Sequence, residues 1–264
     1  MPVRAILFDL DNTLVMEDAA TFAALRRASE VAGPAAGALA AAAAETAAAL
    51  FRDADVFPYC HRFGIWWGEA LWGGFTGDAP GLRALRAFVP GFRDAVWRTA
   101  LAAVGLDPER ASELAAAFAT ARRSDPAVDP AATRTLDTLA RRYRLGLVTN
   151  GAPDVQREKL EASGLAARFA AVVISAELGV GKPEPGIFNA AVERIGVAAS
   201  DAVMVGDSGE RDVAGARAAG LRTVWLDRDG AGDASEAVVR ITRLDELPAA
   251  IDAIGVPAPA ARSA

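Results

Sequence analysis

The chain has 264 residues, of which 52% are hydrophobic, and a net charge of −6 at pH 7. This length holds one large domain or two modest ones. The sequence contains no basic block, which excludes the electrostatic footprint of a nucleic-acid-binding protein. Its one cysteine, Cys60, excludes an internal disulfide and suits a reducing compartment.

We expect a cytoplasmic protein that does not bind a membrane. The first predicted strand begins at residue 3, which leaves no room for a signal peptide. The Ala-rich stretch 35–50 is predicted to be a helix, because Ala is the best helix former. It is too short and too weakly apolar to span a bilayer. The sequence leaves open whether the protein is a monomer or a homodimer.

An apolar run at residues 3–8 predicts a buried parallel strand, and carboxylates follow it directly. Asp9 and Asp11 are spaced two residues apart, and the hydroxyl of Thr13 comes two residues later. Ligands of open α/β sheets bind beyond the carboxyl ends of the strands. Two carboxylates in such a place can hold a divalent cation, and one of them can act as a nucleophile. Taken alone, the same residues would fit a plain acidic turn.

Residues 16–124 form a predicted all-helical insertion, because they carry helical periodicity and lack a convincing strand. Breaks near Gly33, Gly64, Gly73, Pro90 and Gly105 predict four or five helices. The first strand is therefore separated along the chain from the other strands.

From residue 125 onward strands and helices alternate, which predicts βαβ units and a parallel sheet. We expect an α/β fold, with a Rossmann-like, doubly wound parallel sheet that carries the all-α insertion. The core would comprise residues 1–15 and 125–256, and the Pro- and Ala-rich residues 257–264 would form a flexible tail. The later strands are predicted at 145–148, 171–175, 202–205, 223–226 and 238–242, and the helices at 130–142, 153–163, 185–195, 211–219 and 244–254.

Polar side chains also follow two later strands of the predicted sheet. If the strands are parallel neighbours, these side chains meet Asp9 at one edge of the sheet. They are Thr149, Asn150 and Gly151 after the strand at 145–148, and Asp207, Ser208 and the more distant Asp212 after the strand at 202–205.

Only two of the 28 basic residues are lysines, Lys159 and Lys182. Lysine carries a compact charge on a flexible stem, whereas arginine presents a wide planar fork, so a confined site explains a lysine at position 182. A cation held by Asp9 and Asp207, beside Lys182 and the hydroxyl of Thr149, suits a phosphoryl group between Mg²⁺ and an ammonium. Lys159 lies in a polar stretch and is predicted to be a solvated helix residue.

Taken together and in this order, these segments resemble the four-part signature of the haloacid dehalogenase superfamily of aspartate-nucleophile hydrolases. The resemblance covers residues 1–15 and roughly 127–242. The helical insertion is similar to the α-helical C1 cap of this superfamily, which makes residues 16–124 a cap that selects the substrate. The resemblance implies a Mg²⁺-dependent phosphatase that acts on a small phosphorylated metabolite.

The resemblance also implies roles for the polar residues. Asp9 would attack phosphorus to form an aspartyl-phosphate, and Asp11 would protonate the leaving group and then activate water. Mg²⁺ would be held by Asp9, Asp207 and the backbone carbonyl of Asp11. The phosphoryl group would be bound by Thr13, Thr149, Asn150, Gly151 and the catalytic Lys182, while Ser208 and Asp212 would support these groups.

Three alternatives to a phosphatase remain: a dehalogenase, a phosphomutase and a protein without catalytic activity. The dehalogenases themselves lack an acid at the position of Asp11, so its presence favours phosphate esters over haloacids. A phosphomutase with the same covalent step remains an alternative, although the residues after Asp11 depart from the pattern of mutase-like relatives. A non-enzymatic alternative is a binding module that keeps the fold but has no catalytic activity.

The insertion carries an aromatic run at residues 57–67, followed by Trp72 and Phe75. We interpret it as the hydrophobic core of the insertion, because buried aromatics usually pack, with an apolar specificity pocket as the alternative. Cys60 is interpreted as a small packed residue. His61 is assigned no catalytic role, since a lone histidine is a weak functional signal.

Overall fold

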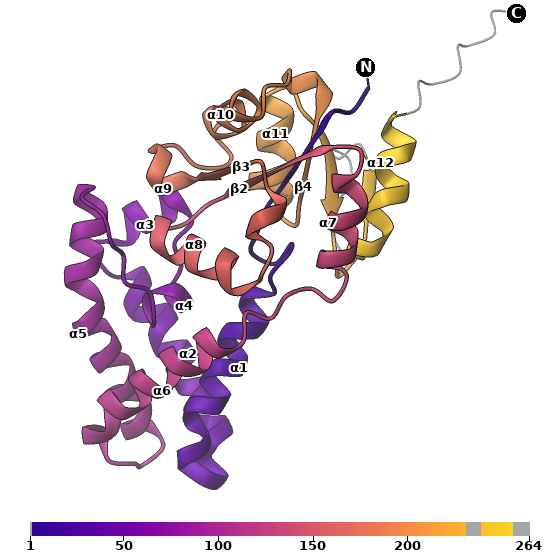
Figure 1. The fold of residues 1–264 in the computed structure, drawn as a ribbon. Coiled ribbons are helices and arrows are strands. Elements are labelled where there is room, and N and C mark those ends of the chain that lie inside the picture. Colours follow the sequence, from indigo (N-terminus) through magenta and orange to yellow (C-terminus); the bar gives the residue numbers. More distant parts are fainter. Residues whose placement is uncertain (1, 231–238, 256–264) are drawn as a thin grey trace, which may run out of the picture.

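The computed structural model describes residues 2–230 and 239–255. Figure 1 shows a twisted sheet flanked by helices, with a separate group of helices beyond one end of the sheet. The predicted tail and residue 238 of the last predicted strand lie outside the described residues.

The sheet has six parallel strands in the order β3-β2-β1-β4-β5-β6. This order confirms the predicted doubly wound α/β fold, because the chain builds the sheet outward in both directions from β1. All six predicted strands are present, with bounds shifted by at most two residues. They are β1 (Ala5–Phe8), β2 (Arg144–Thr149), β3 (Ala171–Ile174), β4 (Ala202–Gly206), β5 (Arg222–Leu226) and β6 (Val239–Ile241).

The central strand β1 is buried on both faces, which explains its unbroken apolar sequence. Successive side chains of a strand point to opposite faces. Ile6 and Phe8 accordingly join one hydrophobic cluster, whereas Ala5 and Leu7 join another. Helices α7 (Ala132–Ala140) and α12 (Leu247–Gly255) cover the first face, and α10 (Pro185–Ile195) and α11 (Gly215–Ala218) cover the second.

The register of the sheet brings the predicted polar segments together. Phe8 of β1 pairs with Leu147 of β2 on one side and with Val205 of β4 on the other. The carboxyl ends of these three strands therefore lie side by side at one edge of the sheet.

Helices α8 (Pro153–Ala162) and α9 (Ser175–Leu178) follow β2 and β3 near this edge. The sequence did not predict α9. The prediction of a single helix at 211–219 was wrong in part, because the chain first forms a wide turn, η5 (Gly209–Ala214). The backbone N–H groups of Asp212 and Val213 both donate to the carbonyl of Ser208, at 3.0 and 3.1 Å, which widens the turn. Short turns also occur at η1 (Glu30–Ala35), η2 (Pro108–Arg110), η3 (Ala166–Arg168), η4 (Ala199–Asp201) and η7 (Leu244–Glu246).

The segment 16–124, which the structure describes throughout, is helical as predicted. It has a hydrophobic cluster of its own, built around large buried side chains such as Trp97, Phe118 and Leu85. This cluster extends to a few residues of α8 and α9, so the insertion packs against the sheet edge. The prediction of four or five helices was wrong, because the segment has six α-helices. They are α1 (Glu17–Ser29), α2 (Ala36–Arg52), α3 (Phe57–Phe63), α4 (Trp67–Ala70), α5 (Pro80–Ala103) and α6 (Ala111–Ser124).

Pro90 does not end a helix, contrary to the prediction. Helix α5 continues through it from residue 80 to residue 103. Proline removes one backbone hydrogen bond from a helix. Burial of Leu85, Val89 and Phe92 along one face of α5, which packs against α2, offsets that loss.

One helical stretch, Glu17–Arg52, is long and apolar enough by length and composition to cross a membrane. It is divided at Gly33, whose positive φ of 56° breaks the helix. The two parts pack as α1 against α6 and as α2 against α5. In this structure they are helices of the insertion.

Candidate active site

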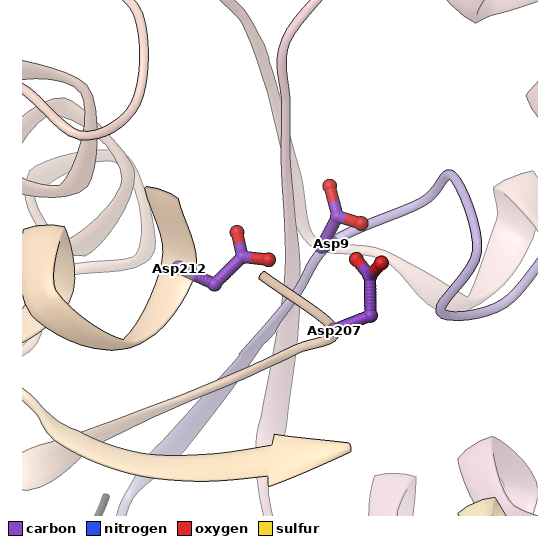
Figure 2. Close-up of side chains that lie close together, drawn as sticks. All are labelled: Asp9, Asp207 and Asp212. Carbon is purple, nitrogen blue, oxygen red and sulfur yellow. The ribbon is translucent and has the colours of Figure 1, made fainter. Parts of the chain in front are cut away.

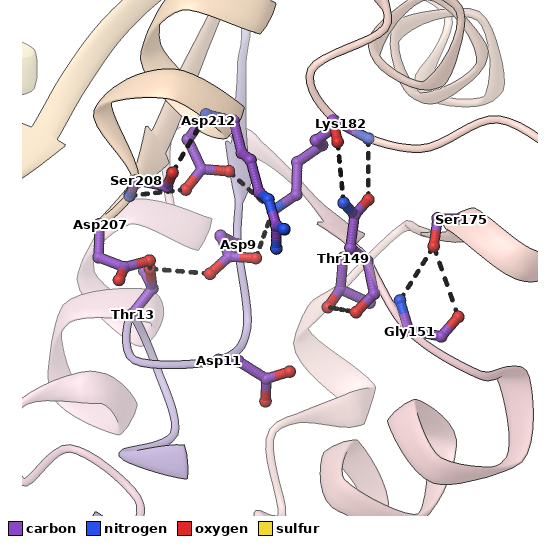
Figure 3. Close-up of polar contacts among 12 residues, drawn as sticks. Asp9, Asp11, Thr13, Thr149, Gly151, Ser175, Lys182, Asp207, Ser208 and Asp212 are labelled. Carbon is purple, nitrogen blue, oxygen red and sulfur yellow. Dashed lines mark hydrogen bonds and ion pairs between the residues drawn. The ribbon is translucent and has the colours of Figure 1, made fainter. Parts of the chain in front are cut away.

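The carboxylate of Asp9 lies at the end of the central strand and is almost fully buried, at 5% exposure. The backbone N–H of Asp9 donates to the carbonyl of Val205, which extends the pairing of β1 with β4 by one residue. Its carboxylate accepts hydrogen bonds from the ammonium of Lys182 and, at 3.1 Å, from the hydroxyl of Thr13 (Figure 3). Asp9 is therefore held at a fixed orientation in a confined polar site.

Three carboxylates meet at this edge: Asp9, Asp207 and Asp212 (Figure 2). One oxygen of each lies within 4.8 Å of the others. Burial, together with the nearby charge of Asp212, raises the pKa of Asp207 to about 7. Burial likewise raises the pKa of Asp9 well above its usual range, although Lys182 opposes the shift. A divalent cation at this point would offset the negative charge of the three carboxylates. Mg²⁺ prefers oxygen ligands such as these carboxylates.

The residues present therefore fit a Mg²⁺ site. Of the predicted ligands, the carboxylates of Asp9 and Asp207 lie in this cluster. Asp212, for which the sequence predicts only a supporting role, also lies in it.

Lys182 lies between two of these carboxylates and is 4% exposed. Its ammonium donates to Asp9 and, at 2.7 Å, to Asp212. Burial alone would lower the pKa of Lys182, but the carboxylates of Asp212 and Asp9 raise it above its ordinary value. The lysine therefore stays charged. Ser208 supports this arrangement, because its backbone N–H donates to Asp212 at 3.0 Å.

The predicted phosphate-binding residues at the end of β2 and directly after it are engaged with other protein groups in this structure. The hydroxyl of Thr149 donates to the side-chain oxygen of Gln156 at 3.0 Å. The backbone N–H of Gly151 donates to the hydroxyl of Ser175 at 2.9 Å. Gly151 has a φ of 144°, and a Cβ atom there would meet Gln156 at 2.4 Å, so only glycine fits. The side-chain amide of Asn150 binds the backbone of Lys182.

Lys159 is buried, so the prediction that it is a solvated residue was wrong. Its exposure is 2%, because it lies on the face of α8 that also buries Val155 and Gln156. Its ammonium donates to both oxygens of Asp11, at 3.0 and 3.1 Å. The signal that pointed to Lys182, a lysine retained in an Arg-rich chain, also applied to Lys159.

Lys159 also contacts two buried glutamates that the sequence did not single out. Glu69 of α4 lies 2.6 Å from the ammonium, and Glu17 of α1 lies 3.1 Å from it. Glu17 is further paired with the buried Arg122 of α6. Burial raises the pKa of Glu69 to about 7, and nearby Lys159 opposes the shift. A buried polar network thus joins three helices of the insertion to Asp11.

A pocket of about 300 Å³ lies between the insertion and the sheet edge, with Asp9, Asp11, Lys182, Asp207 and Asp212 at its base. Two further lining residues, Asn150 and Ser208, are also predicted site residues. The sequence did not predict the others, which are Asn12, Glu17, Asp18, Gly64, Trp66 and Arg211.

Gly64 marks a close approach of the insertion to the site. It ends α3 in the left-handed conformation, and a Cβ atom there would meet the side chain of Asn150 at 2.6 Å. The carbonyl of the preceding Phe63 accepts a hydrogen bond from Ser175 at 2.9 Å. These contacts fix one wall of the pocket.

Within the aromatic run, Phe63 is buried, and Phe57, Tyr59 and Trp67 are partly buried against the hydrophobic cluster of the insertion, as interpreted. Trp72 and Phe75, which follow the run, are buried. Trp66 is different, because it lines the active-site pocket. Cys60 is fully buried, as interpreted. His61 lines a second pocket of about 240 Å³ that shares Gly64, Trp66 and Arg211 with the first.

The model of the haloacid dehalogenase-like hydrolases matches residues 3–220 of the chain. The chain belongs to the haloacid dehalogenase-like hydrolase family. The predicted family is thereby confirmed.

Members of this family with related sequences or folds include phosphatases and dehalogenases. The phosphoserine phosphatase of Thermus thermophilus is 44% identical over 226 residues, which cover 86% of this chain and 89% of the relative. The 2-haloacid dehalogenase of Pseudomonas syringae has a similar structure, with a TM-score of 0.58 and 26% identity over 96% of this chain and 100% of that one. The HAD hydrolase YfnB of Bacillus subtilis shares the fold, with a TM-score of 0.64 and 22% identity over 96% and 100% of the two chains.

Proposed function

We propose that this hydrolase is a Mg²⁺-dependent phosphatase that cleaves a small phosphorylated metabolite through an aspartyl-phosphate on Asp9. The chain is a phosphoric monoester hydrolase, in line with its phosphatase relatives. The observation that carries the mechanism is the confined triad of Asp9, Lys182 and Asp212 at the base of the pocket.

In the first step, Asp9 attacks the phosphorus atom and the bond to the leaving oxygen breaks. Asp11 gives its proton to that oxygen. Lys182 binds a phosphoryl oxygen and keeps Asp9 in place. In the second step, Asp11 takes a proton from water, which attacks phosphorus and frees Asp9 and inorganic phosphate. A Mg²⁺ ion held by Asp9, Asp207 and the Asp11 carbonyl would neutralise the charge of the phosphoryl group.

We propose O-phosphoserine as the first substrate to test. One relative, 44% identical, is named a phosphoserine phosphatase. The wall of the pocket offers charges of both signs, from Asp18 and Arg211. These charges match the ammonium and the carboxylate of an amino-acid phosphate. We expect the helical insertion, residues 16–124, to act as a cap over this substrate, and the protein to be cytoplasmic.

The test is phosphate release by the purified protein from O-phosphoserine, sugar phosphates and 4-nitrophenyl phosphate, with Mg²⁺ or with EDTA. We expect Mg²⁺-dependent release that falls by more than about 1000-fold in Asp9→Asn. The matched control is Asp137→Asn, because Asp137 is an exposed carboxylate paired with Arg168 on the surface. It should leave the rate unchanged.

Three outcomes would contradict the proposal. Activity that survives in Asp9→Asn would exclude the covalent mechanism. A bisphosphate intermediate would indicate a phosphomutase, and halide release from 2-haloacids without metal would indicate a dehalogenase. Release from no substrate at all would favour a binding module.

A further inference from the structure

Both donors that hold the Asp11 carboxylate come from helix α8. The ammonium of Lys159 lies 3.0 and 3.1 Å from its two oxygens, and the side-chain amide of Gln156 lies 3.1 Å from one of them. In Figure 3 the Asp11 carboxyl turns away from Asp9. Its direction in this structure is therefore set by α8.

Both of these donors are in turn held by a single residue of the insertion. One oxygen of Glu69 accepts from Lys159 at 2.6 Å and from Gln156 at 2.9 Å. The other oxygen of Glu69 accepts from the backbone N–H of Trp66, at 3.4 Å, in the wall of the pocket. The Glu69 carboxylate thus connects the pocket wall to the partners of Asp11.

Burial makes this connection stiff. Glu69 is 1% exposed, Gln156 is 1% exposed and Lys159 is 2% exposed. If Lys159 moved away, the buried carboxylate of Glu69 would lose the cation that it contacts, and Glu17 would keep only Arg122. Uncompensated buried charge is strongly unfavourable, so Lys159 and Gln156 have little freedom to turn.

We propose that Glu69 is a positioning residue of the insertion, which orients the acid/base group Asp11 through Lys159 and Gln156. This inference rests on the proposed function, because it takes Asp11 as the group that moves the proton. Glu69 does not touch the substrate in this assignment. It makes the orientation of Asp11 depend on the docking of the insertion against α8.

The test compares Glu69→Gln, which keeps the shape of the side chain and removes its charge, with Glu158→Gln. Glu158 lies next to Lys159 on α8 and also joins the core to the insertion, through Arg123. Both partners of that pair are 44% exposed, and neither contacts Asp11. The control therefore removes a link between insertion and core without touching the network of Asp11.

Leaving-group dependence separates positioning of Asp11 from general damage. An alkyl phosphate such as O-phosphoserine needs a proton on its leaving oxygen, whereas 4-nitrophenyl phosphate does not. In Glu69→Gln we expect kcat for the alkyl ester to fall by about tenfold, with KM changed by less than about twofold. The first burst of nitrophenolate should keep a rate within about twofold of the unmodified protein. Glu158→Gln should leave both substrates unaffected.

A crystal structure of Glu69→Gln gives a readout apart from activity, since the Asp11 side chain should adopt a different direction. Should this variant not fold, as judged by circular dichroism, Gln156→Met is measured in its place. The inference is overturned if the two substrates lose activity equally, if Glu158→Gln behaves like Glu69→Gln, or if Asp11 keeps its direction. An unmodified protein that releases no phosphate would instead overturn the proposed function, and this inference with it.

Discussion

The side-chain amide of Asn150 binds the backbone of Lys182 at both of its polar groups. The Asn150 oxygen accepts from the Lys182 N–H at 2.8 Å, and the Asn150 nitrogen donates to the Lys182 carbonyl at 2.9 Å. The residue that follows β2 therefore fixes the backbone of the lysine that contacts Asp9. The sequence predicts that Asn150 binds the phosphoryl group, and these side-chain contacts add an indirect role that the sequence does not predict. Asn150 also lines the pocket.

The first prediction is that Asn150→Asp disrupts the site without unfolding the protein. The carboxylate would keep the acceptor for the Lys182 N–H but would face the Lys182 carbonyl with a second acceptor. The resulting shift of Lys182 should lower kcat/KM for phosphate esters by about 100-fold, because small misplacements of a catalytic group are costly. The control is Asn189→Asp, the same change at an exposed position of α10. Equal activity of the two variants would contradict the positioning role.

The second prediction concerns Mg²⁺. Asp207→Asn should raise the Mg²⁺ concentration needed for half-maximal activity by at least about tenfold, because the site loses a charged ligand. Mg²⁺ should also raise the thermal midpoint of the unmodified protein, since a ligand that binds only the folded state stabilises it. That rise should be lost in Asp207→Asn. An unchanged thermal response to Mg²⁺ would exclude Asp207 as a ligand.

The sheet and its edge could be predicted because each signal was local. The strand Ala202–Gly206 is buried at every position, and its apolar sequence runs directly into Asp207. Parallel strands then placed Asp9 and Asp207 together without any knowledge of side-chain contacts. Lys182, in the loop before α10, was predicted from its residue type instead. The experiments proposed above test the roles that the sequence predicts for these residues.

The network of Asp11 could not be predicted, because its partners lie far apart in the chain. Glu69 is separated from Gln156 by 87 positions and from Lys159 by 90. A single sequence does not record which face of an inserted helix meets the core. The burial of Lys159 could have been predicted, however, since Val155, Gln156 and Lys159 share a helical face with Leu160. The polar neighbours Arg157 and Glu158 made the whole stretch look exposed in the sequence.

The third prediction tests the hydrophobic core of the insertion with two leucines of the same helix. Leu39 of α2 is fully buried, whereas Leu50 of α2 is 39% exposed. Leu39→Ala should lower the free energy of unfolding by about 2–5 kcal/mol, because it removes buried contacts and leaves a cavity. Leu50→Ala should change it by less than about 1 kcal/mol. Urea unfolding followed by circular dichroism measures both values, and similar losses would contradict the described packing of α2.

The fourth prediction concerns the single cysteine. Cys60 is fully buried, and burial, with a smaller effect of nearby Glu69, raises the pKa of its thiol to about 12. Because the thiolate is the reactive form, a raised pKa and a closed environment both protect the thiol. At pH 8 the native protein should therefore resist iodoacetamide, whereas the protein unfolded in guanidinium chloride should take up one equivalent, as counted by mass spectrometry. Catalytic activity should survive the native treatment. Rapid labelling of the native protein would contradict the complete burial of Cys60.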